Sequence, residues 1–389
     1  MQERMVIGFD AKRAFHNRTG LGHYSRTLLR DLSRFYPEHQ YLLFNPRPSS
    51  LFDVTAFPSL QECLPTAAID RSFPSWWRSS RVVHTLKKES VQLYHGLSHE
   101  LPQGIERAGT KTVVTMHDLI HERYPDQYPW FDRKIYTRKF QYACNVADAI
   151  IAISMQTKKD LIDFYKVPAE KIKVCYQSCN PAFATRVSEA EKERVKTTCG
   201  LPERFFLYVG SIIERKNLLG ICKAMDLLRN EIDIPLVVIG DGKKYLQQVK
   251  AYVEKAKLSN RIIFLSAHPA ARQMSFQNAS DFPAIYQLAT AMIYPSMFEG
   301  FGIPVLEALW SGLPVITSNI SSLPEAGGDA ALYVNPAHPE EIAAHMKRIA
   351  TDAAFAQMLA EKGKLHAQIF DNKRTAAAVM ECYRTLLRS

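Results

Sequence analysis

Two glutamates, Glu299 and Glu307, lie eight residues apart in the segment EGFGIPVLEAL, where their surroundings suit a ligand with both phosphates and hydroxyls. The segment follows an apolar run, and Pro304 is typical of the first position of a helix, where a missing N–H costs nothing. Gly300 and Gly302 let the backbone approach a ligand, and the free N–H groups of a helix start attract phosphate. With two carboxylates as hydroxyl acceptors, the pattern indicates a sugar nucleotide. The alternative is a plain loop with a glutamate in the first helical turn.

A second cluster of polar residues, GSIIERKN, follows another apolar run. Gly210 ends the run, and the adjacent cations Arg215 and Lys216 stand on the way to a helix. Lysine is a good point-charge partner for a diphosphate, and arginine can bind two oxygens at once. These three residues are therefore candidates for binding a diphosphate. A solvated basic loop is the alternative interpretation.

The N-terminal half offers further candidates. Gly20 and Gly22 open a helical pattern in TGLGHYS, but the match to the GxGxxG phosphate motif is incomplete, so we interpret the segment as a flexible glycine loop. His117 follows the apolar run 111–115 and could hold a sugar hydroxyl or move a proton. His95 and His99 follow another run and could line an acceptor site. For each histidine a purely structural role is the alternative.

The elements that must position these residues follow a repeated pattern. Apolar, β-branched runs alternate with helical patterns in both halves, which predicts an α/β fold of doubly wound parallel sheets with helices on both faces. The expected strands are 5–9, 41–44, 91–94, 111–115, 149–153, 172–176, 205–209, 236–239, 262–265, 291–294, 314–317 and 331–334.

A polar stretch, 188–200, separates the two halves. It predicts Rossmann-like domains over 1–185 and 186–370 that face each other across a cleft, with ligands at the carboxyl ends of the strands. The residues from 360 on are helical by pattern, and we expect the helix 371–389 to pack back on the N-terminal domain.

Composition limits the class of protein. With 389 residues, 47% of them apolar and 23% charged, the chain is expected to fold as two domains. No run approaches a membrane span, which favours a soluble or peripheral cytoplasmic protein. The seven cysteines are scattered, and only Cys175 and Cys179 are close, without a second pair to complete a zinc site.

The net charge of +10 suits an acidic partner, which could be phosphate, nucleic acid or an anionic membrane. The basic residues are dispersed and form no recognised nucleic-acid module. Trp76 and Trp77, followed by Arg78 and Arg81, suit a membrane interface. We hypothesise that this segment touches the cytoplasmic membrane surface. The alternative is that the tryptophans pack in the core.

Together these segments resemble retaining glycosyltransferase family 4, also described as glycosyl transferases group 1, which has the GT-B fold. The most specific motif is Glu299-x7-Glu307, and PVI at 314–316, PE at 324–325 and VGSIIERKN continue the likeness. The resemblance implies that Glu299 lies by the donor sugar and Glu307 holds the ribose hydroxyls. The backbone amides of Gly300, Phe301 and Gly302 would then face the sugar and phosphates.

In the same family, Lys216 would contact the diphosphate, the Gly20–Gly22 loop would close on the phosphates, and His117 would touch the transferred sugar. Glu299, His117 and Lys216 are thus the catalytic candidates. Three departures stand out: Ser211 replaces a frequent arginine, the segment at 176–181 lacks a glycine turn, and the connection 268–280 is longer than usual.

The implied reaction transfers a hexose of the mannose or glucose type from a GDP- or UDP-sugar to a hydroxyl of a glycan or polyprenyl-linked acceptor, with retention. No metal and no cofactor are expected, because cationic side chains and a helix start would stabilise the leaving diphosphate. The alternatives are an epimerase or phosphorylase of the same fold, or a non-catalytic glycan- or nucleotide-sugar-binding module.

Overall fold

The computed structural model describes residues 4–388 and divides into two compact units. The first unit contains the chain up to Cys179 together with the segment from Phe370 on, and the second runs from Asn180 to Ile369. The first boundary therefore lies six residues before the expected position near 185. Phe183 explains the difference, because it is buried against the ring of Tyr286, 4.9 Å away between centroids, within the second unit.

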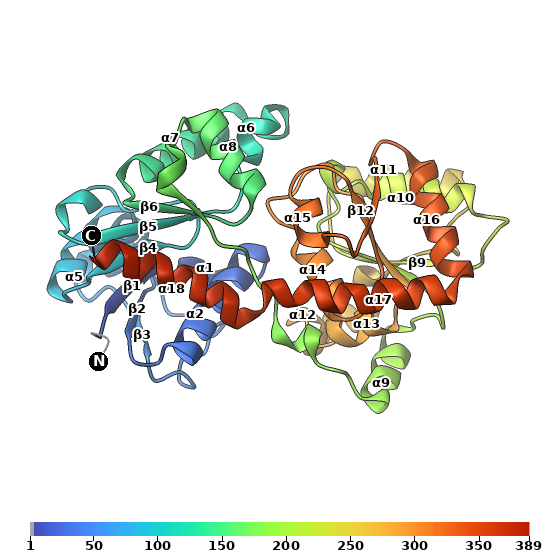
Figure 1. Ribbon diagram of the computed structural model, residues 1–389, viewed down its shortest axis with the longest axis horizontal. Helices are drawn as coiled ribbons and strands as arrows, with labels where there is room; N and C mark the ends of the chain where they lie inside the picture. The colour runs from blue at the N-terminus through green and yellow to red at the C-terminus, as the bar shows by residue number, and fades with distance from the viewer. Residues whose placement is uncertain (1–3, 389) are drawn as a thin grey trace. The chain divides into compact units, whose positions relative to one another are not determined.

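The first unit is built on a parallel seven-stranded sheet of order β3-β2-β1-β4-β5-β6-β7 within residues 4–388. Its strands are β1 (Val6–Asp10), β2 (Gln40–Phe44), β3 (Leu60–Cys63), β4 (Leu93–Gly96), β5 (Lys111–Met116), β6 (Ala149–Ala152) and β7 (Ile172–Val174). Its helices are α1 (Lys12–His16), α2 (Gly20–Phe35), α3 (Ala68–Ser72), α4 (Pro74–Trp76), α5 (Val82–Lys88), α6 (Ile120–Arg123), α7 (Trp130–Val146), α8 (Met155–Tyr165) and α18 (Asn372–Arg388) (Figure 1).

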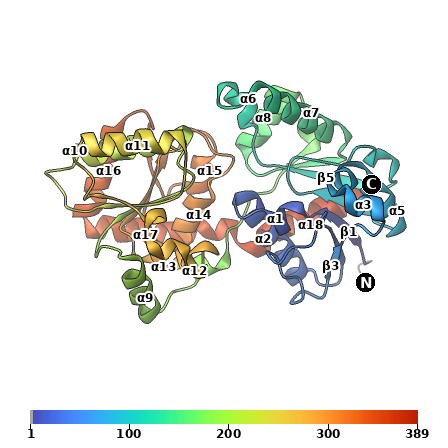
Figure 2. The ribbon, with the colours of Figure 1, turned by 180° about the vertical axis from the view of Figure 1, so that it is seen from behind.

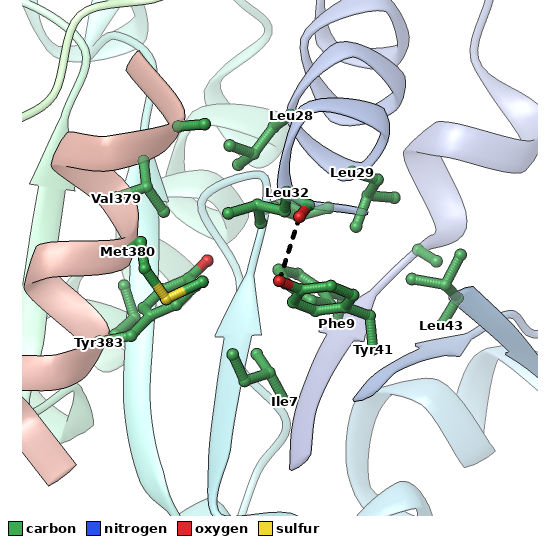
Figure 3. Packing of buried hydrophobic residues seen from close by; sticks show 14 of the residues in the cluster. Ile7, Phe9, Leu28, Leu29, Leu32, Tyr41, Leu43, Val379, Met380 and Tyr383 are labelled. Carbon is green, nitrogen blue, oxygen red and sulfur yellow. Dashed lines mark hydrogen bonds between the residues drawn. The ribbon is translucent and has the colours of Figure 1, made fainter. Parts of the chain in front are cut away.

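Successive side chains of a strand point to opposite faces of the sheet, and here both faces are covered. On β2, Tyr41 and Leu43 join one hydrophobic cluster, whereas Leu42 and Phe44 join another. The first cluster lies under α2 and α18, and Tyr41 donates a hydrogen bond to the carbonyl of Leu32 at 3.2 Å (Figure 3). This two-sided burial explains why the central strands are almost continuously apolar.

The C-terminal segment belongs to the first unit through α18, which packs beside α2. Val379, Met380 and Tyr383 enter the same cluster as Ile7 and Phe9 of β1 (Figure 3). The helical pattern from residue 360 on is not one helix, because α17 ends at Ala367 and a 3-10 turn precedes α18.

The second unit contains a parallel six-stranded sheet of order β10-β9-β8-β11-β12-β13 within residues 4–388. Its strands are β8 (Phe206–Val209), β9 (Leu236–Ile239), β10 (Ile262–Phe264), β11 (Ala291–Tyr294), β12 (Val315–Ser318) and β13 (Leu332–Val334). Its helices are α9 (Glu189–Cys199), α10 (Leu218–Leu227), α11 (Lys244–Lys255), α12 (Met274–Gln277), α13 (Phe282–Leu288), α14 (Ile303–Trp310), α15 (Leu323–Gly327), α16 (Pro339–Thr351) and α17 (Ala353–Ala367) (Figure 2). The expected long connection 268–280 holds a 3-10 turn and α12.

The paired tryptophans do not form an interface together, and this part of the sequence hypothesis is wrong. Trp77 is only 1% exposed and packs against Phe44 in the core of the first unit. Arg78 forms ion pairs with Asp10 and Glu100. Only Trp76 remains largely exposed.

Between residues 4 and 388 the chain has no helix that is both long enough and apolar enough to cross a bilayer. The cysteines are free, and all except Cys63 are buried, as expected of small apolar side chains.

Candidate active site

Two loops at the carboxyl edge of the second sheet are held side by side. Strands β8 and β11 are neighbours, so the loop 210–217 after β8 and the loop 295–302 after β11 leave the sheet next to each other. The amide of Met297 donates to the carbonyl of Arg215 at 2.7 Å, which fixes the two loops together. The two strongest motifs of the sequence therefore meet at one place.

Glu299 is the centre of this place. Its Oε1 accepts hydrogen bonds from the hydroxyls of Ser296 at 2.8 Å and Tyr294 at 3.0 Å. The same oxygen lies 3.1 Å from Nζ of Lys216 and 3.3 Å from a guanidinium nitrogen of Arg215. All four of these side-chain contacts fall on Oε1.

The electrostatics keep Glu299 ionised. Burial acts to raise the pKa of Glu299, but Lys216 and then Arg215 outweigh it, so the pKa is lowered to about 2. The carboxylate is thus a permanent acceptor at neutral pH.

Lys216 and Arg215 are held in different ways. Nζ of Lys216 also donates to the hydroxyl of Tyr294 and lies 4.9 Å from the centroid of that ring. An ammonium has three donors, and two of them are used here. Arg215 is buried, and it donates to the carbonyl of Phe298 in addition to its contact with Glu299.

The loop before α14 is tied down at its backbone. The hydroxyl of Ser322 donates to the carbonyls of Glu299 at 2.8 Å and Phe301 at 3.0 Å. Gly302 caps the helix with φ of +116°, and α14 begins at Ile303, one residue earlier than Pro304 had indicated. The side chain of Phe301 is buried, which leaves its backbone as the part that could face a ligand.

Glu307 lies in the second turn of α14, and its Oε2 accepts a hydrogen bond from the hydroxyl of Tyr286 at 2.9 Å. Burial raises the pKa of Glu307 to about 7, although the Tyr286 hydrogen bond opposes the shift. The two glutamates of the motif therefore differ in charge behaviour, because only Glu299 has cations beside it.

In the first unit, Gly20 and Gly22 do not form a loop, and that expectation is corrected. They occupy the first turn of α2, which begins at Gly20. A Cβ at Gly22 would lie 1.9 Å from the carbonyl oxygen of Asn17, whereas one at Gly20 would have no neighbour within 4 Å. The close approach of Asn17 explains why residue 22 is a glycine, whereas no contact requires a glycine at residue 20.

His117 is buried, and both of its ring nitrogens have protein partners. Nε2 lies 2.9 Å from the carbonyl of Leu97, and Nδ1 lies 3.1 Å from the side-chain nitrogen Nε2 of Gln177. Burial, followed by His99, lowers the pKa of His117 to about 3, so the ring is neutral. A contact with a sugar stays a prediction that would require Gln177 to release Nδ1.

The two other histidines are structural in this unit. His95 is fully buried, with the hydroxyl of Tyr383 2.6 Å from Nδ1 and that of Thr115 2.7 Å from Nε2. His99 stacks on Phe140 and accepts a hydrogen bond from the amide of His117.

Several residues of the site were not assigned from the sequence. Tyr294, Ser296, Tyr286 and Ser322 position the two glutamates, and a glycine turn at 240–242 packs on the loop after β8. A Cβ at Gly240 would lie 1.9 Å from the carbonyl oxygen of Gly210. Tyr294 could have been found, because it is the last residue of a predicted strand directly before the glutamate motif.

Two doubly wound parallel sheets, one of them carrying this glutamate and cation cluster at its carboxyl edge, define a GT-B glycosyltransferase. Family models agree. The model of Glycosyl transferases group 1 matches residues 189–366, and that of Glycosyltransferase Family 4 matches residues 18–183. The chain belongs to glycosyltransferase family 4.

Individual relatives point the same way. The chain is 28% identical to the O-antigen chain mannosyltransferase B of Escherichia coli, over 98% of this chain and 100% of that protein. It is 29% identical to the serotype-specific mannosyltransferase WbdA of Escherichia coli over 76% of this chain, which spans 36% of that longer protein. Anabaena Alr3699/HepE, solved in complex with UDP and glucose, has the same fold, with a TM-score of 0.73, 16% identity and coverage of 98% and 100%.

Proposed function

We propose that the protein transfers mannose, or a related hexose, from a GDP- or UDP-sugar to a hydroxyl of a glycan or polyprenyl-linked acceptor, with retention of configuration. The mannosyltransferase relatives support the sugar, and the UDP complex of a protein with the same fold supports a nucleotide-sugar donor. The observation that carries the proposal is the ionised Glu299 held by Lys216 at the edge of the second sheet.

In this proposal the second oxygen of Glu299 accepts a hydroxyl of the donor sugar. The side chains of Arg215, Tyr294 and Ser296 position Glu299 through its other oxygen. Because the protein already fixes the orientation of this carboxylate, binding a sugar hydroxyl requires no further ordering of the Glu299 side chain. The sugar would therefore be held in one geometry.

The leaving diphosphate gains negative charge as the bond to the anomeric carbon breaks. The third N–H of Lys216 and the N–H groups at the start of α14 would stabilise that charge most in the transition state. We therefore propose a reaction without a metal ion or other cofactor. Glu307, beside Tyr286, would accept the ribose hydroxyls.

We place the reaction in the cytoplasm, where nucleotide sugars would be available, with the protein at the inner membrane surface. Roles for Gly20, Gly22 and His117 at the donor are part of this proposal. For Gly20 the open space around its Cα is the supporting observation.

The decisive experiment is a screen of nucleotide sugars for thermal stabilisation, followed by incubation of each stabilising donor with candidate acceptors. We expect one GDP- or UDP-hexose to stabilise the protein and to give a product whose anomeric configuration, measured by NMR coupling constants, matches that of the donor. An inverted product would refute retention, and stabilisation by no nucleotide sugar would refute the proposed donor class.

A further inference from the structure

The first half of α7 is an amphipathic surface that its own unit leaves uncovered. Trp130 is 52% exposed and Phe131 is 74% exposed, and Ile135 lies one helical turn after Phe131. The buried residues of α7 are Phe140, Ala143 and Cys144, all in its second half. The helix is therefore anchored at one end and presents large apolar side chains to solvent at the other.

The exposed residues are arranged rather than scattered. The rings of Trp130 and Phe131 meet edge to face with centroids 4.8 Å apart, and Nζ of Lys134 lies 3.8 Å from the centroid of Trp130. An aromatic side chain beside an ammonium is typical of interfaces where rings lie among lipid headgroups.

The charge around these side chains is positive. Arg133, Lys134 and Arg138 make no ion pair within residues 4–388, and Lys139 pairs with Glu100 while its side chain stays half exposed. The stretch 130–139 carries one acid, Asp132, against these four bases. Uncompensated cations beside exposed aromatic residues favour an anionic surface as the partner.

A second apolar patch in the same unit provides a comparison. Ile69 on α3, Phe73 between α3 and α4, and Trp76 on α4 are also exposed. Two of the three arginines near them are already paired, Arg78 with Asp10 and Glu100 and Arg81 with Asp70, and only the exposed Arg71 makes no ion pair within residues 4–388. This patch has a similar apolar content, but it has one arginine without an ion pair where α7 has three such cations.

We propose that the α7 surface, formed by Trp130, Phe131, Lys134, Ile135 and Arg138, docks on an anionic lipid bilayer. The rings enter the headgroup region and the cations meet lipid phosphates. This inference goes beyond the proposed function, because it assigns membrane contact to α7 in place of the segment around Trp77. It does not depend on which sugar is transferred.

The test is co-sedimentation of the full chain with vesicles of phosphatidylcholine alone or with about one third phosphatidylglycerol, without any donor. We expect binding to the anionic vesicles only, weakening from 0.1 M to 1 M salt as the Debye length falls from about 10 Å to about 3 Å. The double change Lys134→Glu and Arg138→Glu should weaken binding at least about 25-fold, since each basic residue near the surface is worth about fivefold.

The apolar half of the surface is tested by Trp130→Ser with Phe131→Ser, which should weaken binding about tenfold or more. The matched control is Phe73→Ser with Trp76→Ser on the other patch, which should bind like the unchanged protein. Thermal unfolding checks that each variant is folded, and the charge variant, which alters exposed side chains only, decides the test if the apolar variant is unstable.

Three results would overturn the proposal. They are equal binding to neutral and anionic vesicles, loss of binding in the Phe73 and Trp76 control instead of the α7 variants, and dimerisation that the α7 variants abolish. The last would show that a second copy covers this face. Failure of vesicle binding would leave donor stabilisation intact, so the two proposals can be distinguished.

Discussion

Lys216 and Glu299 form an ion pair in which Nζ lies 3.1 Å from Oε1, and the two residues come from loops after neighbouring strands. The pair joins the two strongest motifs of the sequence, GSIIERKN and EGFGIPVLEAL. The pair therefore places a cation and an anionic acceptor next to each other at the carboxyl edge of the second sheet.

Changing the two glutamates should separate catalysis from donor binding. We expect Glu299→Ala to lower kcat and Glu307→Ala to raise the donor Kd. Each effect should be worth roughly 1.5–3 kcal/mol, the value of a hydrogen bond to a charged group. Steady-state kinetics and calorimetric titration with the donor measure the two effects. Unchanged transfer rates in both variants would refute the assignment of the motif.

The raised pKa of Glu307 should give the protein two opposite pH dependences. Between about 4.5 and 7 the unfolded chain has released this proton while the folded chain keeps it, so this group makes stability fall as pH rises through that window. Donor affinity should instead rise through pH 7, because an ionised carboxylate is the better acceptor for ribose hydroxyls.

Thermal unfolding and donor titration from pH 5 to 8, with Glu307→Gln as the reference, measure both effects. The variant should lack both contributions. Curves of the same shape for the two proteins would show that Glu307 is already ionised in the folded state.

Transfer should survive an excess of EDTA. The expected reason is that Lys216 and the N–H groups at the start of α14 supply the positive charge that a metal ion supplies elsewhere. Radiolabelled sugar transfer, measured before and after chelation, provides the test. Loss of activity that magnesium or manganese restores would require a metal-dependent mechanism.

The two glycines of α2 should respond differently to alanine. Gly22→Ala should destabilise the protein because its Cβ would overlap the carbonyl oxygen of Asn17, and Gly20→Ala should fold normally because its Cβ meets nothing. Urea unfolding measures stability and donor titration measures binding. A folded Gly20→Ala variant with weakened donor binding would support a ligand at this turn, whereas unchanged binding would remove Gly20 from the site.

The ion pairs of Arg78 and Arg81 should differ in strength. Arg78→Met strands the buried Asp10 carboxylate and should cost about 3–5 kcal/mol of unfolding free energy. Arg81 is about one-third exposed, so water reaches this pair although its partner Asp70 is buried, and Arg81→Met should cost less, about 1–3 kcal/mol. Urea denaturation followed by circular dichroism compares the two. Equal losses of unfolding free energy in the two variants would contradict the prediction that the more deeply buried ion pair contributes more to stability.

The sequence predicted the strands well because both sheets are covered on both faces. Such strands are continuous apolar runs, and β9 and β11 appear at the predicted residues. The edge strand β3 was missed because its sequence, LQEC, is half polar and it pairs only with β2. Periodicity cannot distinguish such a strand from a loop.

The candidate site was predicted in part. The meeting of Glu299 with Lys216 follows from strand order, since ligand loops in a parallel sheet gather at the carboxyl edge. The burial of Trp77 could not be read from its neighbours, because adjacent residues of a helix point in different directions. The partners of His117 come from Leu97 and Gln177, far apart in sequence, and local spacing gives no indication of them.

Helix α18 follows the second unit in sequence but packs in the first unit, and this affects the order in which the two units fold during synthesis. The second unit is one continuous stretch, so it can complete its core as soon as it leaves the ribosome. The hydrophobic cluster of the first unit is complete only after Val379, Met380 and Tyr383 have been synthesised. The hydroxyl of Tyr383 lies 2.6 Å from Nδ1 of His95. Although domains usually mature from the N-terminus onward, here the earlier unit is the later one to finish. A chain that has emerged from the ribosome only as far as residue 370 would therefore contain a complete second unit, while the central cluster of the first unit still lacks α18.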